Sequence, residues 1–231
     1  MDKLLTVVIP SYNVEKFLNQ TLDSFVCDEA VMKKFEVIVV DDGSKDNTAK
    51  IGKEYADKYP DTFRVISKEN GGHGSTINCG IRNAVGKYFK VVDGDDWVNT
   101  ADFVKLVEDL EKTESEYVFT NYNEYYDDVN RQKTVDFPQF KDGTEYDFAD
   151  VANKVYIPMH ALVIKTSVLK DNNIVIDEKC FYVDVEYVMF PVPFVNKVTF
   201  FDLHVYMYRL ALSTQSVSIL GFQKHINDHL R

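Results

Sequence analysis

Residues 87–98, KYFKVVDGDDWV, join a strand-like run to a cluster of acidic side chains. β-Branched and aromatic residues fill the first half of this stretch, as they do in buried strands. Asp93, Asp95 and Asp96 then follow within four positions, and Trp97, the one tryptophan in the chain, comes next. Like charges repel, so such a cluster needs water, a helix N-terminus or a cation to relieve it. The stretch therefore indicates one of two things. It is either a solvated turn in which an aspartate caps a helix beginning near Thr100, or a cation site at the end of a strand.

The same order of strand, polar loop and helix occurs three times before this stretch. Strand-like apolar runs occupy residues 4–10, 35–40, 63–67 and 87–92, and a further one occupies 116–122. Each of the first four is followed by a polar cluster, namely SYN, DDGS, NGGHG and DGDD. Apolar residues at helical spacing come next, and Asn13 is the expected N-cap of the first helix. The order predicts an α/β fold with a mostly parallel sheet covered by helices on both faces.

The second half of the chain is less regular. Residues 123–137 suggest a strand, a turn and a returning strand, and residues 160–169 suggest a strand that runs into a helical turn. Pro191 and Pro193 limit a helix within residues 180–195 to about two turns. We expect one domain over residues 1–231, with a nucleotide-type half at 1–100 and an appended half at 101–220. Helical spacing at 221–231 suggests the start of a C-terminal extension.

Composition narrows the classes of protein that fit. Of the 231 residues, 45% are hydrophobic and 13% aromatic, as in a globular domain, and the formal net charge is -11. That charge argues against nucleic acid or an anionic membrane as the main partner. No segment approaches the roughly 20 apolar residues of a membrane span, and the N-terminus reads as a strand, not a secretion signal. Cys27, Cys79 and Cys180 lack metal-ligand spacing and suggest reduced thiols in a cytoplasmic protein.

Each polar cluster has a plain structural interpretation beside a functional one. DDGS at 41–44 fits a type I turn, or a carboxylate that accepts hydrogen bonds from a base or a ribose. Gly72, His73 and Gly74 begin the pattern G-x-G-x-x-G, but Ile77 stands where its third glycine belongs, so the dinucleotide fingerprint fails. The loop amides before the next helix can still approach a phosphate or a sugar. His73 itself is read as an ordinary loop histidine in preference to a catalytic one.

Two more acidic residues, Asp184 and Glu186, lie in the apolar stretch FYVDVEYVMF. One can cap the short helix while the other faces solvent. A carboxylate held among aromatic side chains is also a candidate general base. The spacing does not choose between the two residues or between the two interpretations.

Taken together, these stretches resemble the family 2 glycosyltransferases with the GT-A fold. Residues 6–24, 36–48 and 70–98 carry the resemblance, and residues 182–195 and 205–218 carry it more loosely. The resemblance implies a Rossmann-like, mostly parallel sheet flanked by helices, with a smaller mixed sheet on the acceptor side. It also implies transfer of a sugar, with inversion, from a nucleotide-sugar to a hydroxyl group of a glycan, glycoprotein or glycolipid. UDP-sugars are the favoured donors.

The resemblance assigns roles to individual residues. Asp95 would be the main ligand of Mn²⁺ or Mg²⁺, Asp93 would contact the metal and the donor, and Asp96 would support both. Asp184 would be the catalytic base, although Val183 precedes it where the family usually has glutamate. Ile77 likewise replaces an arginine often found in the family. The implied nucleotide-sugar-binding residues are Pro10, Ser11, Tyr12, Asn13, Asp41, Asp42, Asn70, Gly71, Gly72, Asp93 and Asp96.

Two other functions are kept as alternatives. A catalytically silent partner subunit of an active transferase would retain the fold without a working base. A sugar-phosphate nucleotidyltransferase usually begins with a glycine- and arginine-rich loop, and PSYNVEKF at residues 10–17 has neither residue. For the transferase we expect a cytoplasmic location, and this includes peripheral attachment to the inner face of the membrane. We expect no nucleic-acid partner and no integral membrane segment, and we allow for a homo-oligomer.

Overall fold

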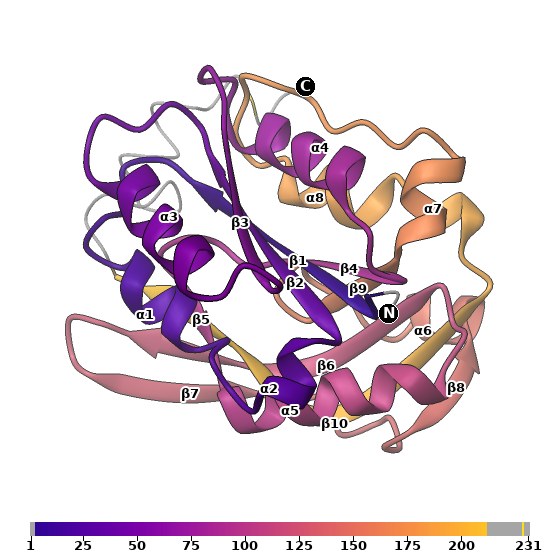
Figure 1. The fold of residues 1–231 in the computed structure, drawn as a ribbon. Helices are drawn as coiled ribbons and strands as arrows, with labels where there is room; N and C mark the ends of the chain where they lie inside the picture. The colour runs from indigo at the N-terminus through magenta and orange to yellow at the C-terminus, as the bar shows by residue number, and fades with distance from the viewer. Residues whose placement is uncertain (1–2, 212–227, 229–231) are drawn as a thin grey trace.

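The computed structural model describes residues 3–211 and residue 228, and a sheet of ten strands runs through this part of the chain (Figure 1). The strand order is β3-β2-β1-β4-β9-β6-β10-β5, with β7 beside β6 and β8 beside β10. The strands are β1 (Leu5–Ser11), β2 (Phe35–Asp41), β3 (Phe63–Ser67), β4 (Tyr88–Val91), β5 (Trp97–Val98), β6 (Tyr117–Tyr126), β7 (Arg131–Val135), β8 (Thr144–Asp147), β9 (Leu162–Lys165) and β10 (Lys197–Leu210).

Helices connect and cover these strands (Figure 1). They are α1 (Leu18–Asp23), α2 (Glu29–Met32), α3 (Thr48–Lys58), α4 (His73–Asn83), α5 (Thr100–Asp109), α6 (Phe148–Ala152), α7 (Thr166–Asp171) and α8 (Asp184–Met189), with short 3₁₀ helices η1 (Leu110–Lys112) and η2 (Val192–Phe194). None of the described helices is long and apolar enough to cross a membrane. The predicted helical spacing at 221–231, and the family-like residues 212–218, lie outside the described residues apart from Asp228.

The first half is the parallel sheet that the sequence predicts. β1 pairs in parallel with β2 and β4, and β2 pairs in parallel with β3. All seven residues of both β1 and β2 are buried, because helices lie over both faces. The carboxyl ends of β1 to β4 therefore meet at one edge, and the four polar clusters follow them there.

The mixed half continues the same sheet. β9 lies antiparallel to β4 and β6, and β10 lies parallel to β6. The predicted strand, turn and returning strand form the β6–β7 hairpin, which extends at the lower left of Figure 1. The predicted helix ahead of the two prolines is α8. The two halves thus share backbone hydrogen bonds through β4 and β9.

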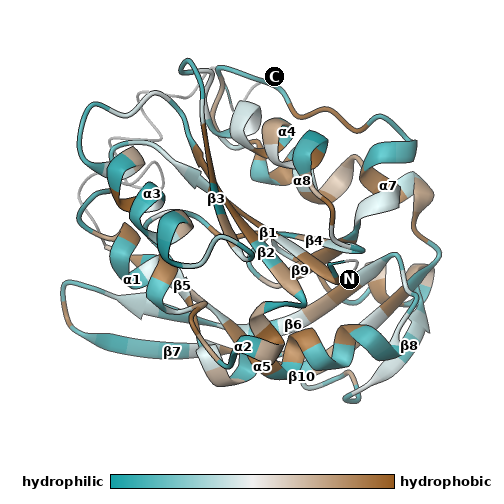
Figure 2. Cartoon of the chain, viewed as in Figure 1, coloured by the Kyte–Doolittle hydropathy of each residue, from teal (hydrophilic) through white to brown (hydrophobic). Residues whose placement is uncertain are grey.

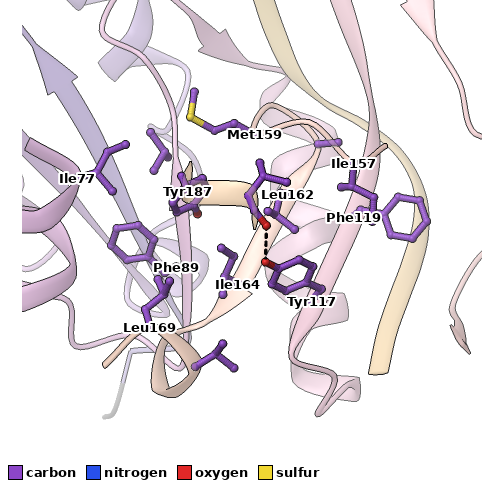
Figure 3. Close-up of a cluster of buried hydrophobic side chains, with 14 of the residues drawn as sticks. Ile77, Phe89, Tyr117, Phe119, Ile157, Met159, Leu162, Ile164, Leu169 and Tyr187 are labelled. Atoms are coloured by element: carbon purple, nitrogen blue, oxygen red, sulfur yellow. Dashed lines mark hydrogen bonds between the residues drawn. The ribbon is translucent and has the colours of Figure 1, made fainter. Parts of the chain in front are cut away.

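Alternate residues of the strands feed two apolar layers. Val8 and Ile38 point into one layer with α4, α7 and α8, whereas Val7 and Val37 point into the other with α1 and α5. Figure 2 shows the central strands β1, β2 and β3 as mainly hydrophobic, whereas the β7 strand and much of α1 and α3 are hydrophilic. Fully burying each large apolar side chain contributes about 1.5–3 kcal/mol. Figure 3 shows the layer that contains α8, and this packing holds the helix against the sheet.

The first helix begins later than the sequence predicts. α1 starts at Leu18 with Phe17 at its N-cap position, so the assignment of Asn13 as the N-cap is wrong. Asn13 instead has a φ of 54°, in the left-handed region that asparagine tolerates. Its side-chain Oδ1 accepts a hydrogen bond from the Lys45 amide at 2.8 Å. Asn13 therefore ties the loop after β1 to the loop after β2.

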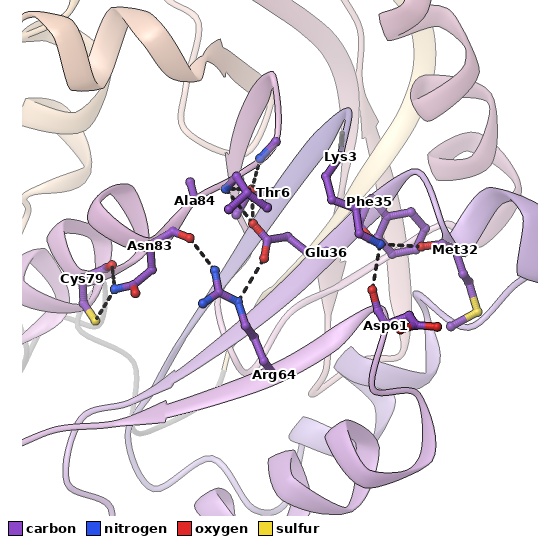
Figure 4. Close-up of polar contacts among 12 residues, drawn as sticks. Lys3, Thr6, Met32, Phe35, Glu36, Asp61, Arg64, Cys79, Asn83 and Ala84 are labelled. Carbon is purple, nitrogen blue, oxygen red and sulfur yellow. Dashed lines mark hydrogen bonds and ion pairs between the residues drawn. The ribbon is translucent and has the colours of Figure 1, made fainter. Parts of the chain in front are cut away.

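An ionic network around the buried Glu36 side chain braces the opposite end of the parallel strands (Figure 4). The Glu36 carboxylate accepts hydrogen bonds from Thr6 Oγ1 at 2.5 Å and from Arg64 Nε at 3.0 Å. The Arg64 guanidinium also donates to the Asn83 carbonyl at the end of α4. A charge buried without a partner would be costly, and here each is paired. The network links β1, β2, β3 and α4 into one platform for the loops at the other edge.

Two buried tyrosines of the apolar layer differ in hydrogen bonding. The Tyr117 hydroxyl donates to the Val188 carbonyl at 2.8 Å (Figure 3), whereas the Tyr187 hydroxyl has no partner within the described part of the chain. We expect Tyr187→Phe to raise the free energy of unfolding by about 1 kcal/mol, because it removes an unsatisfied buried hydroxyl. Tyr117→Phe should lower it by about 1 kcal/mol, because a carbonyl loses its donor. Urea unfolding of both variants tests this. Equal losses in the two would contradict the assignment.

Candidate functional site

The loops at the carboxyl edge enclose a cavity of 450 Å³. Six of the predicted residues line it, namely Pro10, Ser11, Tyr12, Asp42, Asn70 and Gly72. The sequence did not predict the other lining residues, which are His73, Thr76, Lys179, Cys180 and Phe181. Lys179 to Phe181 belong to the loop before α8, so the second half of the chain closes a cavity built mainly by the first.

Asp42 organises one wall of this cavity. Its side chain is 2% exposed, and Oδ1 accepts hydrogen bonds from Lys68 Nζ at 2.6 Å and from the Gly71 amide at 3.0 Å. Oδ2 accepts from the Gly72 amide at 2.8 Å. Asp42 therefore holds the glycine loop in place, and it leaves only its remaining lone pairs for a ligand.

Two glycines of NGGHG let the loop before α8 approach. Gly72 has a φ of +85°, and a Cβ there would lie 3.2 Å from the Lys179 amide nitrogen. A Cβ on Gly74 would lie 2.0 Å from the Asp177 carbonyl oxygen, which no side chain allows. These glycines therefore serve close backbone packing, and the Lys179 amide donates to the Gly71 carbonyl at 2.8 Å.

The other predicted residues of this loop edge have structural partners. Asp41 is 4% exposed, and its Oδ1 accepts from the Ser44 amide at 3.0 Å, which closes the DDGS turn. Asn13, Asp41 and Gly71 are not among the described residues that line the cavity. They shape its walls through the contacts described above.

A second cavity, of 230 Å³, adjoins the first. His73 and Phe181 line both cavities, which makes the two neighbours. The second is lined by His73, Asp93, Met159, His160, Phe181, Tyr182, Val183, Asp184 and Tyr208. The fold therefore brings Asp93, at the end of β4, and Asp184, at the start of α8, to one space.

Asp93 is paired with a histidine. His73 Nε2 and Asp93 Oδ1 lie 2.8 Å apart. Burial opposes ionisation of Asp93, but the charge and hydrogen bond of His73 lower the pKa of this carboxyl below its ordinary value. Burial likewise opposes the charged His73, but Asp93, Asp184 and Asp95 raise the pKa of the imidazole above its ordinary value. Asp93 is thus favoured as a carboxylate and His73 as a cation.

Asp95 is left as a carboxyl with few neighbours to stabilise its charge. Burial, and then the charge of Asp93, raises the pKa of Asp95 to about 6. No other residue in the described part of the chain donates a hydrogen bond to its side chain. Its backbone carbonyl accepts from Arg209 Nε at 2.8 Å, and the positive charges of Arg209 and His73 offset only part of the rise in the pKa.

Asp96 points into the protein. Its side chain is 2% exposed, Oδ2 accepts from the Tyr206 hydroxyl at 2.6 Å and Oδ1 accepts from the Arg209 amide at 2.7 Å. Burial, with the charges of Asp95 and Asp93, raises the pKa of Asp96 well above its ordinary value. Its hydrogen bonds fit the supporting role that was expected, while its contact with a nucleotide-sugar stays a prediction.

The helix after the acidic loop does not relieve the cluster. α5 starts at Thr100 as predicted, but its N-cap is Asn99, whose Oδ1 accepts from the Asp102 amide at 3.2 Å. A cation from β10 lies nearby instead. The Arg209 guanidinium bonds to Asp127 and to Gln20 Oε1, and it lies 4.7 Å from the centre of the Trp97 ring. Arg209 is a functional candidate that the sequence did not reveal.

The structure separates Asp184 from Glu186. Asp184 lines the second cavity, and burial raises its pKa above the ordinary value, with His73 opposing and Asp93 adding to the rise. Glu186 accepts a hydrogen bond from the Asp177 amide at 2.7 Å and so holds the loop before α8. Geometry therefore favours Asp184 as the residue that faces a ligand.

Asp93 and Asp95 are the candidate metal ligands. Among residues 3–211 and 228, no group of three or more histidine, cysteine or acidic side chains is arranged to hold a metal ion. Mg²⁺ and Mn²⁺ are often bound by one or two carboxylates, with substrate phosphates completing the shell. Asp95 receives no hydrogen bond from another side chain in the described part of the chain, and Asp93 is favoured in its ionised form. Both residues therefore fit a site of that kind.

Comparison with known proteins identifies the family. Residues 6–172 match the family model described as Glycosyl transferase family 2. EpsJ of Bacillus subtilis, named an uncharacterized glycosyltransferase, is 38% identical over 118 residues, which are 51% of this chain and 33% of EpsJ. GgaB of Bacillus subtilis, a minor teichoic acid biosynthesis protein, is 33% identical over 111 residues, which are 48% of this chain and 12% of GgaB. The matches thus span a third or less of these relatives.

Solved structures share the fold. The chain superposes on S. aureus TarS 1–349 in complex with UDP-GlcNAc with a TM-score of 0.79 and 22% identity, covering 97% of this chain and 64% of that one. The mannosyltransferase PcManGT from Pyrobaculum calidifontis, in complex with GDP-Man and Mn²⁺, superposes with a TM-score of 0.69 and 17% sequence identity. This superposition covers 99% of the present chain and 63% of the PcManGT chain. The protein is an α/β protein of the GT-A fold, as predicted. The chain belongs to glycosyl transferase family 2.

The raised pKa of Asp95 makes a prediction about stability. The folded state keeps the Asp95 proton to about pH 6, whereas the unfolded chain releases it near 4, so ionisation costs stability as pH rises through this window. The Asp95→Asn side chain does not ionise and so lacks this cost. We therefore expect the difference in free energy of unfolding, variant minus wild type, to grow by up to about 3 kcal/mol between about pH 4 and pH 7. Urea unfolding with EDTA present measures the difference. A difference independent of pH would contradict the prediction.

Proposed function

We propose that this chain is an inverting glycosyltransferase that transfers a sugar from a nucleotide-sugar, with UDP-sugars favoured, to an acceptor hydroxyl. The acceptor class is a glycan, glycoprotein or glycolipid. One observation carries the proposal, namely that two cavities share His73 and Phe181. Six of the predicted nucleotide-sugar-binding residues line one cavity, and Asp93 and Asp184 line the other. Such an arrangement suits a donor that reaches from one cavity into the other.

The first cavity suits a nucleotide. Tyr12, with 48% of its surface exposed, offers a ring face to a base, and Ser11 and Asn70 add polar groups to the lining of the cavity. Lys179 adds a positive charge at the rim. In an acidic protein, these local donors and charges are what a diphosphate would need.

The acidic loop suits a divalent cation, with Asp95 and Asp93 as the residues that would hold Mn²⁺ or Mg²⁺. When bound, such an ion offsets the negative charge that grows on the departing nucleoside diphosphate. Asp96, Tyr206 and Arg209 keep the loop in position through their hydrogen bonds. The complex of PcManGT with Mn²⁺ supports the choice of ion.

Asp184 is the proposed general base. It lies in the second cavity, and its raised pKa makes the carboxylate a better proton acceptor than an exposed aspartate. It would remove the proton of the acceptor hydroxyl as that oxygen attacks the anomeric carbon from the side opposite the diphosphate. Attack from that side inverts the configuration. The complexes of TarS with UDP-GlcNAc and UDP support a uridine nucleotide as the donor.

Two broader features belong to the same proposal. Residues 1–231 are taken as one domain, because β4 and β9 join both halves in one sheet. A cytoplasmic location, including attachment to the inner face of a membrane, fits the three cysteines, all of which are free thiols.

The proposal predicts that nucleotide binding depends on Asp95 and on the metal. We expect wild-type protein to bind UDP in the presence of Mn²⁺ and to lose at least about tenfold in affinity with EDTA, because the diphosphate then meets uncompensated carboxylates. Asp95→Ala should lose as much with Mn²⁺ present. Isothermal titration calorimetry measures both, with the exposed Asp57→Ala as control. Unchanged binding by Asp95→Ala, or binding independent of metal, would count against the site.

The proposal also predicts a separation of turnover from binding at Asp184. Asp184→Asn should reduce donor turnover by about 10²–10⁴-fold, because proton removal is lost, while UDP affinity stays within about twofold. Glu186→Gln is the matched control and should retain turnover. Release of UDP from a panel of nucleotide-sugars is the assay. Wild-type protein that binds UDP but turns over none of them would favour the silent partner subunit.

A further inference from the structure

His160 has no role in the function proposed above, yet its ring lines the second cavity. It lies in the turn before β9 and lines that cavity together with Asp93 and Asp184. No residue in the described part of the chain forms a hydrogen bond with its ring nitrogens. The Tyr208 hydroxyl, which lines the same cavity, is also without a hydrogen-bond partner there. Polar groups placed in this way need water or a ligand.

The structure holds the His160 ring in one orientation. Tyr208 stacks on it with ring centres 3.9 Å apart and planes at 28°, and Tyr206 meets it edge to face at 4.9 Å. The His160 carbonyl accepts a hydrogen bond at 2.9 Å from Lys90 Nζ, and Lys90 is 0% exposed within β4. Both the ring and the backbone are therefore placed before any ligand arrives, and such preorganisation is characteristic of binding residues.

The chemistry of the two groups matches a hydroxyl. Burial lowers the pKa of His160 to about 4, so the ring is neutral near pH 7 and has one donor and one acceptor nitrogen. Tyr208 adds a hydroxyl that both donates and accepts. The hydroxyl groups of a sugar also donate and accept. A phosphate, in contrast, would prefer cations, and neither the neutral His160 ring nor the Tyr208 hydroxyl carries a positive charge.

The position of the cavity indicates which part of the donor meets these groups. The cavity joins the proposed nucleotide cavity through His73 and Phe181, and Asp184 lies within it. In the proposed reaction, the group between the diphosphate and the base is the transferred monosaccharide. The His160 ring therefore faces the sugar and not the nucleotide.

We propose that His160 is a sugar-recognition residue, which forms a hydrogen bond with a hydroxyl of the transferred monosaccharide, with the Tyr208 hydroxyl as a second contact. This inference rests on the proposed function and adds a residue that contributes to specificity for the transferred sugar. Two tyrosines pack against the neutral ring, and Lys90 holds the backbone of His160 through its carbonyl. A ring held in this way favours a hydroxyl in one orientation over another.

The experiment compares nucleotides with and without a sugar. Wild type, His160→Phe and Tyr208→Phe are titrated with UDP and GDP, and with UDP-GlcNAc, UDP-glucose, UDP-galactose and GDP-mannose, with Mn²⁺ present. Phenylalanine keeps the ring stacking and removes only the hydrogen-bonding atoms. For the preferred nucleotide-sugar we expect about a 3–10-fold loss of affinity in each variant, with free nucleoside diphosphate affinity within about twofold. His204→Phe, at a histidine paired with Asp136 elsewhere, should change neither.

The outcomes separate this inference from the function on which it rests. Equal affinity of wild type and His160→Phe for every nucleotide-sugar would overturn it, as would an equal loss for nucleotides with and without sugar. A changed acceptor KM with unchanged donor affinity would also overturn it, in favour of an acceptor contact. If wild type binds no nucleoside diphosphate at all, the proposed function fails and the inference with it. Should His160→Phe not fold, as judged by its thermal transition, His160→Gln is subject to the same criteria.

Discussion

The hydrogen bonds that Asp96 forms through its buried carboxyl group are the contacts on which the candidate site depends. They come from the Tyr206 hydroxyl and the Arg209 amide, both in β10, while Asp96 lies in the loop after β4. A strand of the mixed half thereby fixes the acidic loop of the parallel half. A buried carboxylate would be costly without such donors, and with them it becomes a specific attachment point. Asp93 and Asp95, the other carboxyl groups of the loop, follow β4 at the same edge of the sheet.

This arrangement leaves charge imbalance where a ligand would enter. His73 stabilises ionised Asp93, whereas burial and repulsion raise the pKa values of Asp95 and Asp184. Neighbouring carboxyl groups thus differ in how readily each holds a proton, a pattern typical of sites where a cation and a general base work side by side. Grouping these carboxyl groups lowers the stability of the folded protein, because like charges are held close together. The buried pairing of Glu36 with Arg64 at the far end of β2 shows the opposite case, in which the charges are matched.

Much of the fold could be predicted because its information is local. Buried strands such as β1 and β2 read as short apolar runs, and helical spacing marked α5 and α8 within a few residues of their bounds. Polar clusters after parallel strands must meet at one edge, so the grouping of Asp42 with Asn70 followed from topology. The start of α1 was missed, because the Asn13 side chain bonds to a loop distant in sequence instead of capping the helix.

The sequence by itself determined the α/β class, the family, and the identity of the acidic and glycine-rich loops, because each of these is written in short segments whose residues act together. Only the tertiary structure decided that Asp184 and not Glu186 faces the cavity, that Asp96 points inward, and that Lys179, His160, Tyr208 and Arg209 join the site. These residues come from the mixed half, where neither a motif nor a regular spacing distinguishes a ligand contact from a core residue. Their function follows from which distant strand or loop they pack against, and packing of that kind is settled only when the whole sheet has formed.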